Sequence, residues 1–203
     1  MALKRSRKNT EQRFQDAVLE LVAESGCAHL GVNLVAQRAG SDKVLIYRYF
    51  GGIEGLLQSV AESRTWLPEA NELLHSVSGR PAQILSQLAS LLCRHIRMDA
   101  TTHQLSLWRR ASANPLTRQY TRDWDNLWLD LGEQLGRGLA YQARQNWARA
   151  CALLALTIEA DLAGESIDSG CLELLGDQLE GSLIEPPMAE TRVKEDVLPT
   201  NLL

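Results

Sequence analysis

Apolar residues recur at helical spacing in the first part of the chain. Between residues 14 and 22 they follow the i, i+3/i+4 rule, and Gly26 ends this segment because glycine readily forms a left-handed helix cap. Shorter patterns of the same kind predict a helix over 32–38, another that begins after Asp42, and a fourth over about 53–65. The first third of the chain is therefore expected to hold four helices.

The rest of the chain shows longer stripes with the same period. They cover residues 84–96, 103–113, 115–139, 146–164 and 169–184. Pro115 suits the first turn of a helix, since a proline there costs no helical hydrogen bond. No strand-like alternation or internal repeat is visible, and residues 186–203 show no period, which is typical of a flexible tail. The pattern predicts an all-α protein with a boundary near residues 50–65.

The segment VAQRAGSDKVLIYRYF, residues 35–50, has the features of a helix–turn–helix unit. Such a unit needs two short helices, a tight turn that often contains glycine, and small residues where the helices touch. Ala36, Ala39 and Gly40 meet these needs, and Asp42 is expected to cap the second helix. The outer surface of that helix is expected to carry Lys43, Tyr47 and Arg48. These side chains suit phosphate groups and base edges.

The charge distribution supports a polyanion as the partner of the N-terminal part only. The whole chain has a formal net charge of −4. Residues 1–50 nevertheless contain eight Lys and Arg against five Asp and Glu, whereas the remainder is acidic. A basic N-terminal part on an acidic body predicts that only the former meets DNA.

Over residues 12–60 the chain resembles the DNA-binding domain of the tetracycline-repressor-like (TetR) family of bacterial regulators, with AVLELVAESG, VAQRAG and the spaced Lys43, Tyr47 and Phe50 as the most specific parts. The resemblance implies that Lys43 and Tyr47 contact phosphate and that Phe50 closes the core. It also places Val44, Leu45 and Arg48 near base edges and Asn33 near the backbone or a base. The full set of expected DNA-binding residues is Asn33, Asp42, Lys43, Val44, Leu45, Tyr47 and Arg48.

The resemblance implies a division of the chain. We expect a homeodomain-like helix–turn–helix domain over 1–52, a helical ligand-binding and dimerisation domain over 53–185, and a flexible tail over 186–203. The basic residues of KRSRK, positions 4–8, form an N-terminal arm in this interpretation. That arm is either disordered or reaches into an adjacent minor groove.

Several residues depart from the family pattern. Leu30-Gly31 makes a weak start for the first helix of the unit, Ser41 replaces an apolar residue after the turn, and Gly51-Gly52-Ile53 lacks a lysine that family members carry there. These departures leave the fold intact but make the operator sequence unreadable. They also keep open an alternative function, a helical protein–protein interaction module with degenerate DNA binding.

Aromatic residues of the C-terminal part are candidates for a ligand pocket. Trp124 and Trp128 lie four residues apart and share one helix face, with Tyr120 one turn earlier and Trp108 on the preceding segment. Aromatic side chains line many apolar pockets, although plain core packing is the alternative. The pocket hypothesis predicts an unidentified small-molecule effector.

The last two long segments, 145–164 and 169–184, are apolar on more than one face. Such helices usually need a second surface to cover them, and the family resemblance implies a symmetric four-helix bundle between two copies. A buried hairpin within one monomer is the alternative. We therefore expect a homodimer through these two segments.

Other function classes find no support in the sequence. The four cysteines are scattered without zinc-like spacing, and no phosphate loop or catalytic motif is present, so we expect no metal, no cofactor and no enzyme activity. No signal peptide or apolar run of membrane-spanning length occurs, which predicts a cytoplasmic protein with no membrane contact. The sequence predicts a one-component transcription regulator, a repressor that a small molecule releases from operator DNA.

Overall fold

The computed structural model describes residues 2–164, 174, 176–177 and 179–180, and this part of the chain is all-α, without a strand. The helices are α1 (Ala2–Ser25), α2 (Val32–Ala39), α3 (Val44–Phe50), α4 (Ile53–Ala61), α5 (Ala70–His75), α6 (Pro81–Met98), α7 (Ala100–Trp108), α8 (Pro115–Leu135) and α9 (Tyr141–Leu162). The predicted fold class is confirmed. The expected helix over 169–184 and the expected tail over 186–203 lie almost wholly outside the described residues.

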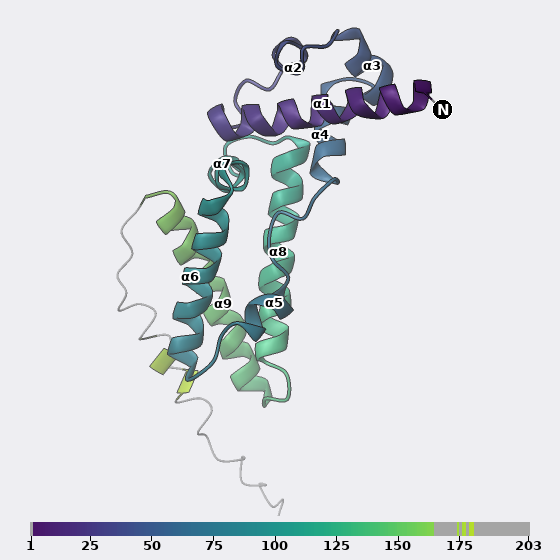
Figure 1. Ribbon diagram of the computed structural model, residues 1–203. Coiled ribbons are helices and arrows are strands. Elements are labelled where there is room, and N and C mark those ends of the chain that lie inside the picture. Colours follow the sequence, from purple (N-terminus) through teal and green to yellow (C-terminus); the bar gives the residue numbers. More distant parts are fainter. Residues whose placement is uncertain (1, 165–173, 175, 178, 181–203) are drawn as a thin grey trace, which may run out of the picture.

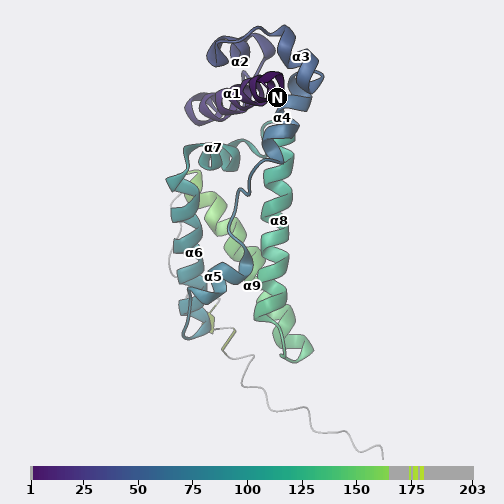
Figure 2. The ribbon, with the colours of Figure 1, turned by 45° about the vertical axis from the view of Figure 1, so that its right-hand side comes forward.

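The helices form a small head, made of α1 to α4, on an elongated body, made of α5 to α9. In Figure 1, α1 crosses one end of the body, and α2 and α3 lie on the side of α1 that faces away from the body. Helices α6, α8 and α9 run along the length of the body. Figure 2 shows α4 directly above the first turn of α8, and these two helices are in contact. The head therefore meets the body through α1 against α7 and through α4 against α8.

The first helix is longer than the apolar pattern indicates. α1 begins at Ala2, so the basic residues at positions 4–8 lie on its first turns rather than on a separate arm. No glycine or proline interrupts this segment, and the helix can therefore continue to its start. Arg7 pairs with Glu11 at 2.7 Å and stacks over the ring of Tyr49 at 4.9 Å, which fixes α1 against α3.

Capping residues set the helix ends in the body. The side chain of Asn114 accepts hydrogen bonds from the N–H groups of Leu116 and Thr117 at 2.9 and 3.1 Å, and Pro115 occupies the first turn of α8 as predicted. The short helix α5 was not predicted, because six residues are too few to show a helical period. It lies against α6 and α8.

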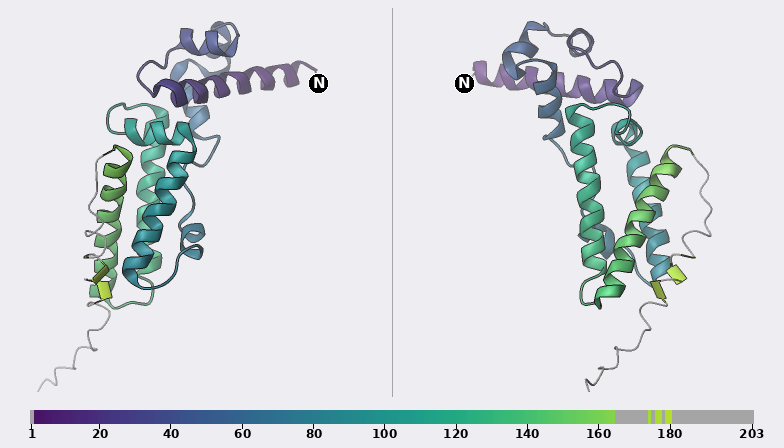
Figure 3. Two further views of the ribbon diagram at one scale, coloured as in Figure 1. Left: turned by 60° about the vertical axis from the view of Figure 1, so that its left-hand side comes forward. Right: turned by 180° about the vertical axis from the view of Figure 1, so that it is seen from behind.

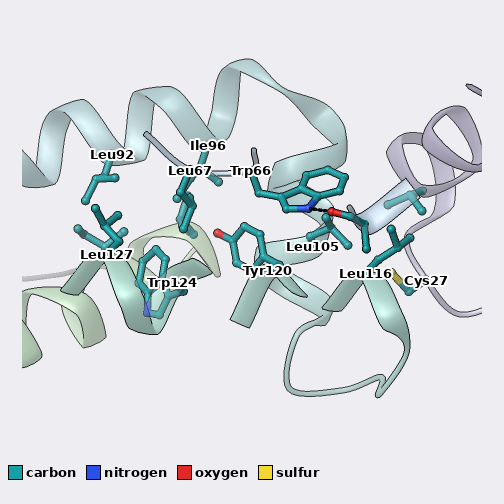
Figure 4. Close-up of a cluster of buried hydrophobic side chains, with 14 of the residues drawn as sticks. Cys27, Trp66, Leu67, Leu92, Ile96, Leu105, Leu116, Tyr120, Trp124 and Leu127 are labelled. Carbon is teal, nitrogen blue, oxygen red and sulfur yellow. Dashed lines mark hydrogen bonds between the residues drawn. The ribbon is translucent and has the colours of Figure 1, made fainter. Parts of the chain in front are cut away.

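In the described part of the chain, a continuous hydrophobic core runs from the head into the body. Figure 4 shows its central part, where Tyr120 and Trp124 of α8 face Leu92 and Ile96 of α6. The indole of Trp66 is fully buried beside them and donates to the carbonyl of Ala61 at 3.3 Å. None of the helices in the described part of the chain is both long and apolar enough to cross a membrane.

Candidate functional site

A tight turn joins α2 and α3. Gly40 ends α2 in the left-handed conformation, with φ of 56°, and the N–H of Ser41 donates to the carbonyl of Ala36 at 3.1 Å. The guanidinium of Arg13 on α1 donates to the carbonyls of Ala39 and Gly40 at 2.5 and 3.2 Å. The turn is therefore held by a hydrogen bond to α2 and by the side chain of Arg13 on α1.

Asp42 lies just before α3 and caps its first turn, as the sequence predicts. Its carboxylate accepts a hydrogen bond from the N–H of Val44 at 2.9 Å, which satisfies one of the free donors at the helix start. The predicted weak start of α2 is also observed, since Gly31 offers no side-chain cap. Asp42 thus acts on its own helix, and this contact leaves less of its carboxylate for another partner.

Most of the sequence-predicted contact residues lie together on an exposed face of α2 and α3. The ammonium group of Lys43 donates to the side-chain oxygen of Asn33 at 3.2 Å, which joins the two helices at their outer surface. Val44 and Tyr47 are 60% and 57% exposed, large values for such apolar and aromatic side chains. Arg48 is exposed and has no ion-pair partner among the described residues.

The opposite side of α3 belongs to the core. Ile46 is fully buried, Leu45 is half-buried, and the ring of Phe50 meets that of Phe14 edge-on with centroids 6.3 Å apart. Phe50 therefore closes the head core, as predicted. Because Leu45 is partly covered by the core, it can offer only part of its side chain to a partner.

Another arginine of the head is directed away from this face. Arg38 pairs with Glu24 at 2.6 Å and with Glu20 at 3.3 Å, which joins α2 to α1. The hydrogen bonds from Arg38 lower the pKa of Glu24, and those from the two carboxylates raise the pKa of Arg38. Arg38 is thus neutralised within the head, whereas Lys43 and Arg48 have no carboxylate partner in the described part of the chain.

This face has the chemistry to bind a nucleic acid. An ammonium and a guanidinium group attract phosphate, a phenol hydroxyl donates to phosphate, and arginine can also read guanine. The sequence did not predict the contact from Arg13 that supports the turn. It joins residues 26 positions apart, so no local pattern could have indicated it.

The candidate pocket residues separate into two groups. The rings of Tyr120, Trp124 and Trp128 form a continuous row along α8, with centroids 6.4 and 5.6 Å apart. Trp108 lies elsewhere, against Gly26 at the end of α1. A Cβ atom on Gly26 would come within 2.0 Å of the indole nitrogen of Trp108, so only glycine admits this contact.

A groove of about 740 Å³ lies between α8 and α9. The two helices approach closely where Gly132 faces Ala148, and they diverge toward α7 (Figure 3, right). Trp124 and Trp128 line this groove together with the aliphatic side chains of Leu129 and Leu156. Tyr120 is buried and does not line it.

The groove contains a partly buried cluster of charges. Glu159 of α9 pairs with Arg109 and also with Arg110, the latter at 2.5 Å. The side chain of Arg109 is only 8% exposed, and its guanidinium lies over the ring of Trp124 at 5.0 Å. Burial, with the neighbouring charge of Arg110, lowers the pKa of Arg109. No local sequence pattern could have indicated this pairing, because Glu159 follows Arg109 by 50 residues.

Two polar atoms of the aromatic row have no hydrogen-bond partner among the described residues. They are the hydroxyl of Tyr120 and the indole nitrogen of Trp128, both buried. Burial also raises the pKa of Tyr120. An indole nitrogen is a donor only, so Trp128 requires an acceptor. No group of three or more metal-ligating side chains is gathered within the described part of the chain.

Comparison with protein families assigns the head. Residues 16–60 match the model of a family described as bacterial regulatory proteins, tetR family. The matched segment holds the end of α1, the whole α2–turn–α3 unit and nearly all of α4. A comparison with curated proteins found no match.

Solved structures of similar chains include several regulators. AlkX from Dietzia sp. strain DQ12-45-1b, a TetR family repressor implicated in biodegradation of n-alkanes, is 23% identical over 85% of this chain and 96% of its own, with a TM-score of 0.46. A TetR family regulator from Marinobacter aquaeolei VT8 is 15% identical over 90% and 98%, with a TM-score of 0.42. An alanine-substituted HlyIIR mutant is 15% identical over 89% and 99%, with a TM-score of 0.44.

Proposed function

Because the chain belongs, through residues 16–60, to the tetR family of bacterial regulatory proteins, we propose that it is a homodimeric transcriptional repressor that a small molecule releases from operator DNA. It is a DNA-binding transcription regulator of that family. The sign of regulation, the dimer and the effector are the parts that we propose.

The exposed face of α2 and α3 carries the proposal for DNA. Lys43 and Tyr47 contact phosphate, Arg48 and Val44 reach base edges, and Asn33 assists from the first helix of the unit. The exposure of Tyr47 and Val44 supports this assignment, because large aromatic and aliphatic side chains at the surface are available to a partner. Leu45 contributes an edge contact, and Asp42 contributes chiefly by holding the start of α3.

The division at residue 52 belongs to the proposal. Gly51 and Gly52 have φ values of 77° and 134°, so the chain changes direction between α3 and α4. We assign residues 1–52 to DNA binding and 53–185 to regulation and dimerisation. The proposed tail over 186–203 lies outside the described residues.

Dimerisation is proposed through α9 and the segment 169–184. On α9, Leu153 and Leu156 are 46% and 54% exposed, which places two large apolar side chains close together at the surface of one helix. A second copy would cover them and would place two heads at a fixed separation, as recognition of two half-sites requires. Most of 169–184 lies outside the described part of the chain, so α9 alone supports this assignment here.

The effector is proposed to bind at the row of Trp124 and Trp128. A ligand that binds one arrangement of the heads better than the other shifts the dimer toward it. If that arrangement no longer matches the operator, repression ends. Since coupling between two sites is reciprocal, DNA must weaken effector binding by the same factor.

A titration of the full chain with DNA tests the proposal. Fluorescence anisotropy would compare a duplex from upstream of the chain's own gene with a scrambled duplex of equal length and composition. We expect tighter binding to the upstream duplex, and lower transcription of a reporter placed behind it. Equal affinity for both duplexes would contradict the proposal that the upstream duplex contains an operator. Raised reporter transcription would contradict the proposed repression.

A further inference from the structure

We propose that the groove between α8 and α9 binds an aromatic carboxylate, whose carboxylate group replaces that of Glu159 on Arg109 and Arg110. This inference rests on the proposed function, since the groove is the effector site of that proposal. It adds the chemical class of the ligand, which the aromatic row alone does not define.

The charged cluster in the groove favours an anion. Arg109 and Arg110 share the single carboxylate of Glu159, so the cluster has one positive charge in excess. Arg144, which also lines the groove, has no ion-pair partner among the described residues. The acidic residues Asp125 and Glu133 lie exposed at the rim, where water screens them more than it screens the buried Arg109.

The aromatic row disfavours a cationic ligand. A cation would bind best over the face of an indole ring, but Arg109 already lies over the ring of Trp124 at 5.0 Å. A second cation would meet the nearly buried charge of Arg109 at close range. An anion instead meets the guanidinium fork, which suits the two oxygens of a carboxylate.

The unpartnered indole nitrogen of Trp128 supplies an independent indication. Trp128 is 8% exposed, lines the groove, and has a buried N–H without an acceptor among the described residues. A buried donor left without an acceptor is costly, and an oxygen of the ligand would remove that cost. The donors in the groove wall thus call for a ligand that is rich in acceptors.

The shape of the groove favours a flat apolar body next to the carboxylate. Its volume of about 740 Å³ falls within the range of roughly 300–1,000 Å³ that is usual for small-molecule pockets. Trp124, Ala155 and Gly132 form buried parts of the lining, and Leu129 extends it outward. One or two fused aromatic rings would lie against these side chains.

Calorimetry with three matched probes tests the inference on the full chain. The probes are 2-naphthoate, the neutral 2-naphthamide and 2-naphthylmethylammonium, which share one ring system. We expect 2-naphthoate to bind at least about tenfold more tightly than the amide, and the ammonium probe to bind most weakly, because only the carboxylate pairs with the arginines. Equal affinities for the three probes, or no binding of 2-naphthoate, would overturn the inference.

The substitution Glu159→Gln is the sharpest variant. It removes the competing carboxylate and should raise the affinity for 2-naphthoate by about tenfold, with little change for the amide. A purely structural role of Glu159 predicts weaker binding of every probe instead. Asp130→Asn is the matched control, since this exposed acid on α8 does not line the groove and should change affinity less than about twofold. A folded Glu159→Gln protein with unchanged or weaker 2-naphthoate binding would refute the exchange.

Arg110→Gln keeps the inference testable if Glu159→Gln does not fold, because the side chain of Arg110 is 70% exposed. It should weaken 2-naphthoate binding about three- to tenfold and leave the amide unchanged. Equal effects on both probes would overturn the role of Arg110.

A parallel DNA titration separates the two proposals. Probe binding without an effect on DNA affinity supports the groove ligand but removes its role as an effector. DNA binding without probe binding supports the DNA-binding function and overturns the groove ligand.

Discussion

At the scale of single residues, the contact face was largely predictable because its signals are local. The spacing of Lys43, Tyr47 and Phe50 separates the exposed side of α3 from its core side, and the structure keeps that separation. Asp42 was grouped with the DNA-binding residues and is observed to cap α3. Arg13, which holds the turn, could not be found, because its partners lie 26 and 27 positions away.

Arg48 should distinguish sequence-specific from general binding. If its guanidinium makes a bidentate contact with guanine, Arg48→Ala should cost about 1–3 kcal/mol on the true operator and much less on random DNA. Anisotropy titrations on both duplexes measure the difference. An equal loss on the two would reassign Arg48 to the DNA backbone.

Asp42 should act through the stability of α3. Asp42→Ala removes the acceptor for the N–H of Val44 and should lower the free energy of unfolding by about 0.5–2 kcal/mol. Asp42→Asn keeps an acceptor and should preserve both stability and DNA affinity. Urea denaturation of the two variants checks this. A large loss of DNA affinity in a fully stable Asp42→Asn protein would show that the carboxylate itself meets DNA.

At the scale of elements, helix ends were predictable wherever a cap marks them. Gly26 and Pro115 lie at the helix ends that the sequence indicated, since such signals depend on a few neighbouring residues. The packing between elements was not predictable in this way. Trp108 and Arg109 are consecutive, yet one packs against Gly26 of the head and the other pairs with Glu159 of α9.

The contact between Gly26 and Trp108 should stabilise the junction between the head and the body. Gly26 has φ of 69°, and an added Cβ would meet the indole, so Gly26→Ala should lower the free energy of unfolding by about 1–3 kcal/mol. Combined with Trp108→Ala, the double variant should lose less than the sum of the two single losses. Thermal melts of all four proteins supply the cycle. Strict additivity would show that the clash has no energetic role.

At the scale of the whole molecule, the sequence indicates two parts of opposite charge more directly than it indicates how two copies assemble. The basic head and acidic body follow from counting charges, and the match over residues 16–60 confirms the family of the head. The dimer depends on surfaces of two copies, and no pattern within one chain defines how they meet. Exposed leucines on α9 are the observation that supports it.

The dimer hypothesis predicts a specific failure for Leu153→Glu. Leu153 is half-exposed in the protomer and does not line the groove, so a glutamate there should be tolerated in a monomer and buried without a partner in a dimer. Sedimentation should show a wild-type dimer and a folded monomeric variant with weakened operator binding. Met98→Glu, at an 81% exposed position on α6, is the control and should remain dimeric. A monodisperse wild-type monomer at micromolar concentration would defeat the hypothesis.

The salt dependence of DNA binding tests the central claim most directly. Anisotropy titrations of wild type, Lys43→Ala and Tyr47→Phe over a series of salt concentrations give the slope of log affinity against log salt. Loss of the Lys43 contact should make that slope shallower by about one unit per bound protomer, on specific and random DNA alike. Tyr47→Phe should weaken binding to both duplexes with little change in slope, because a neutral hydroxyl releases no counterion. Wild-type affinity and slope in both variants would show that α3 does not bind DNA through this face.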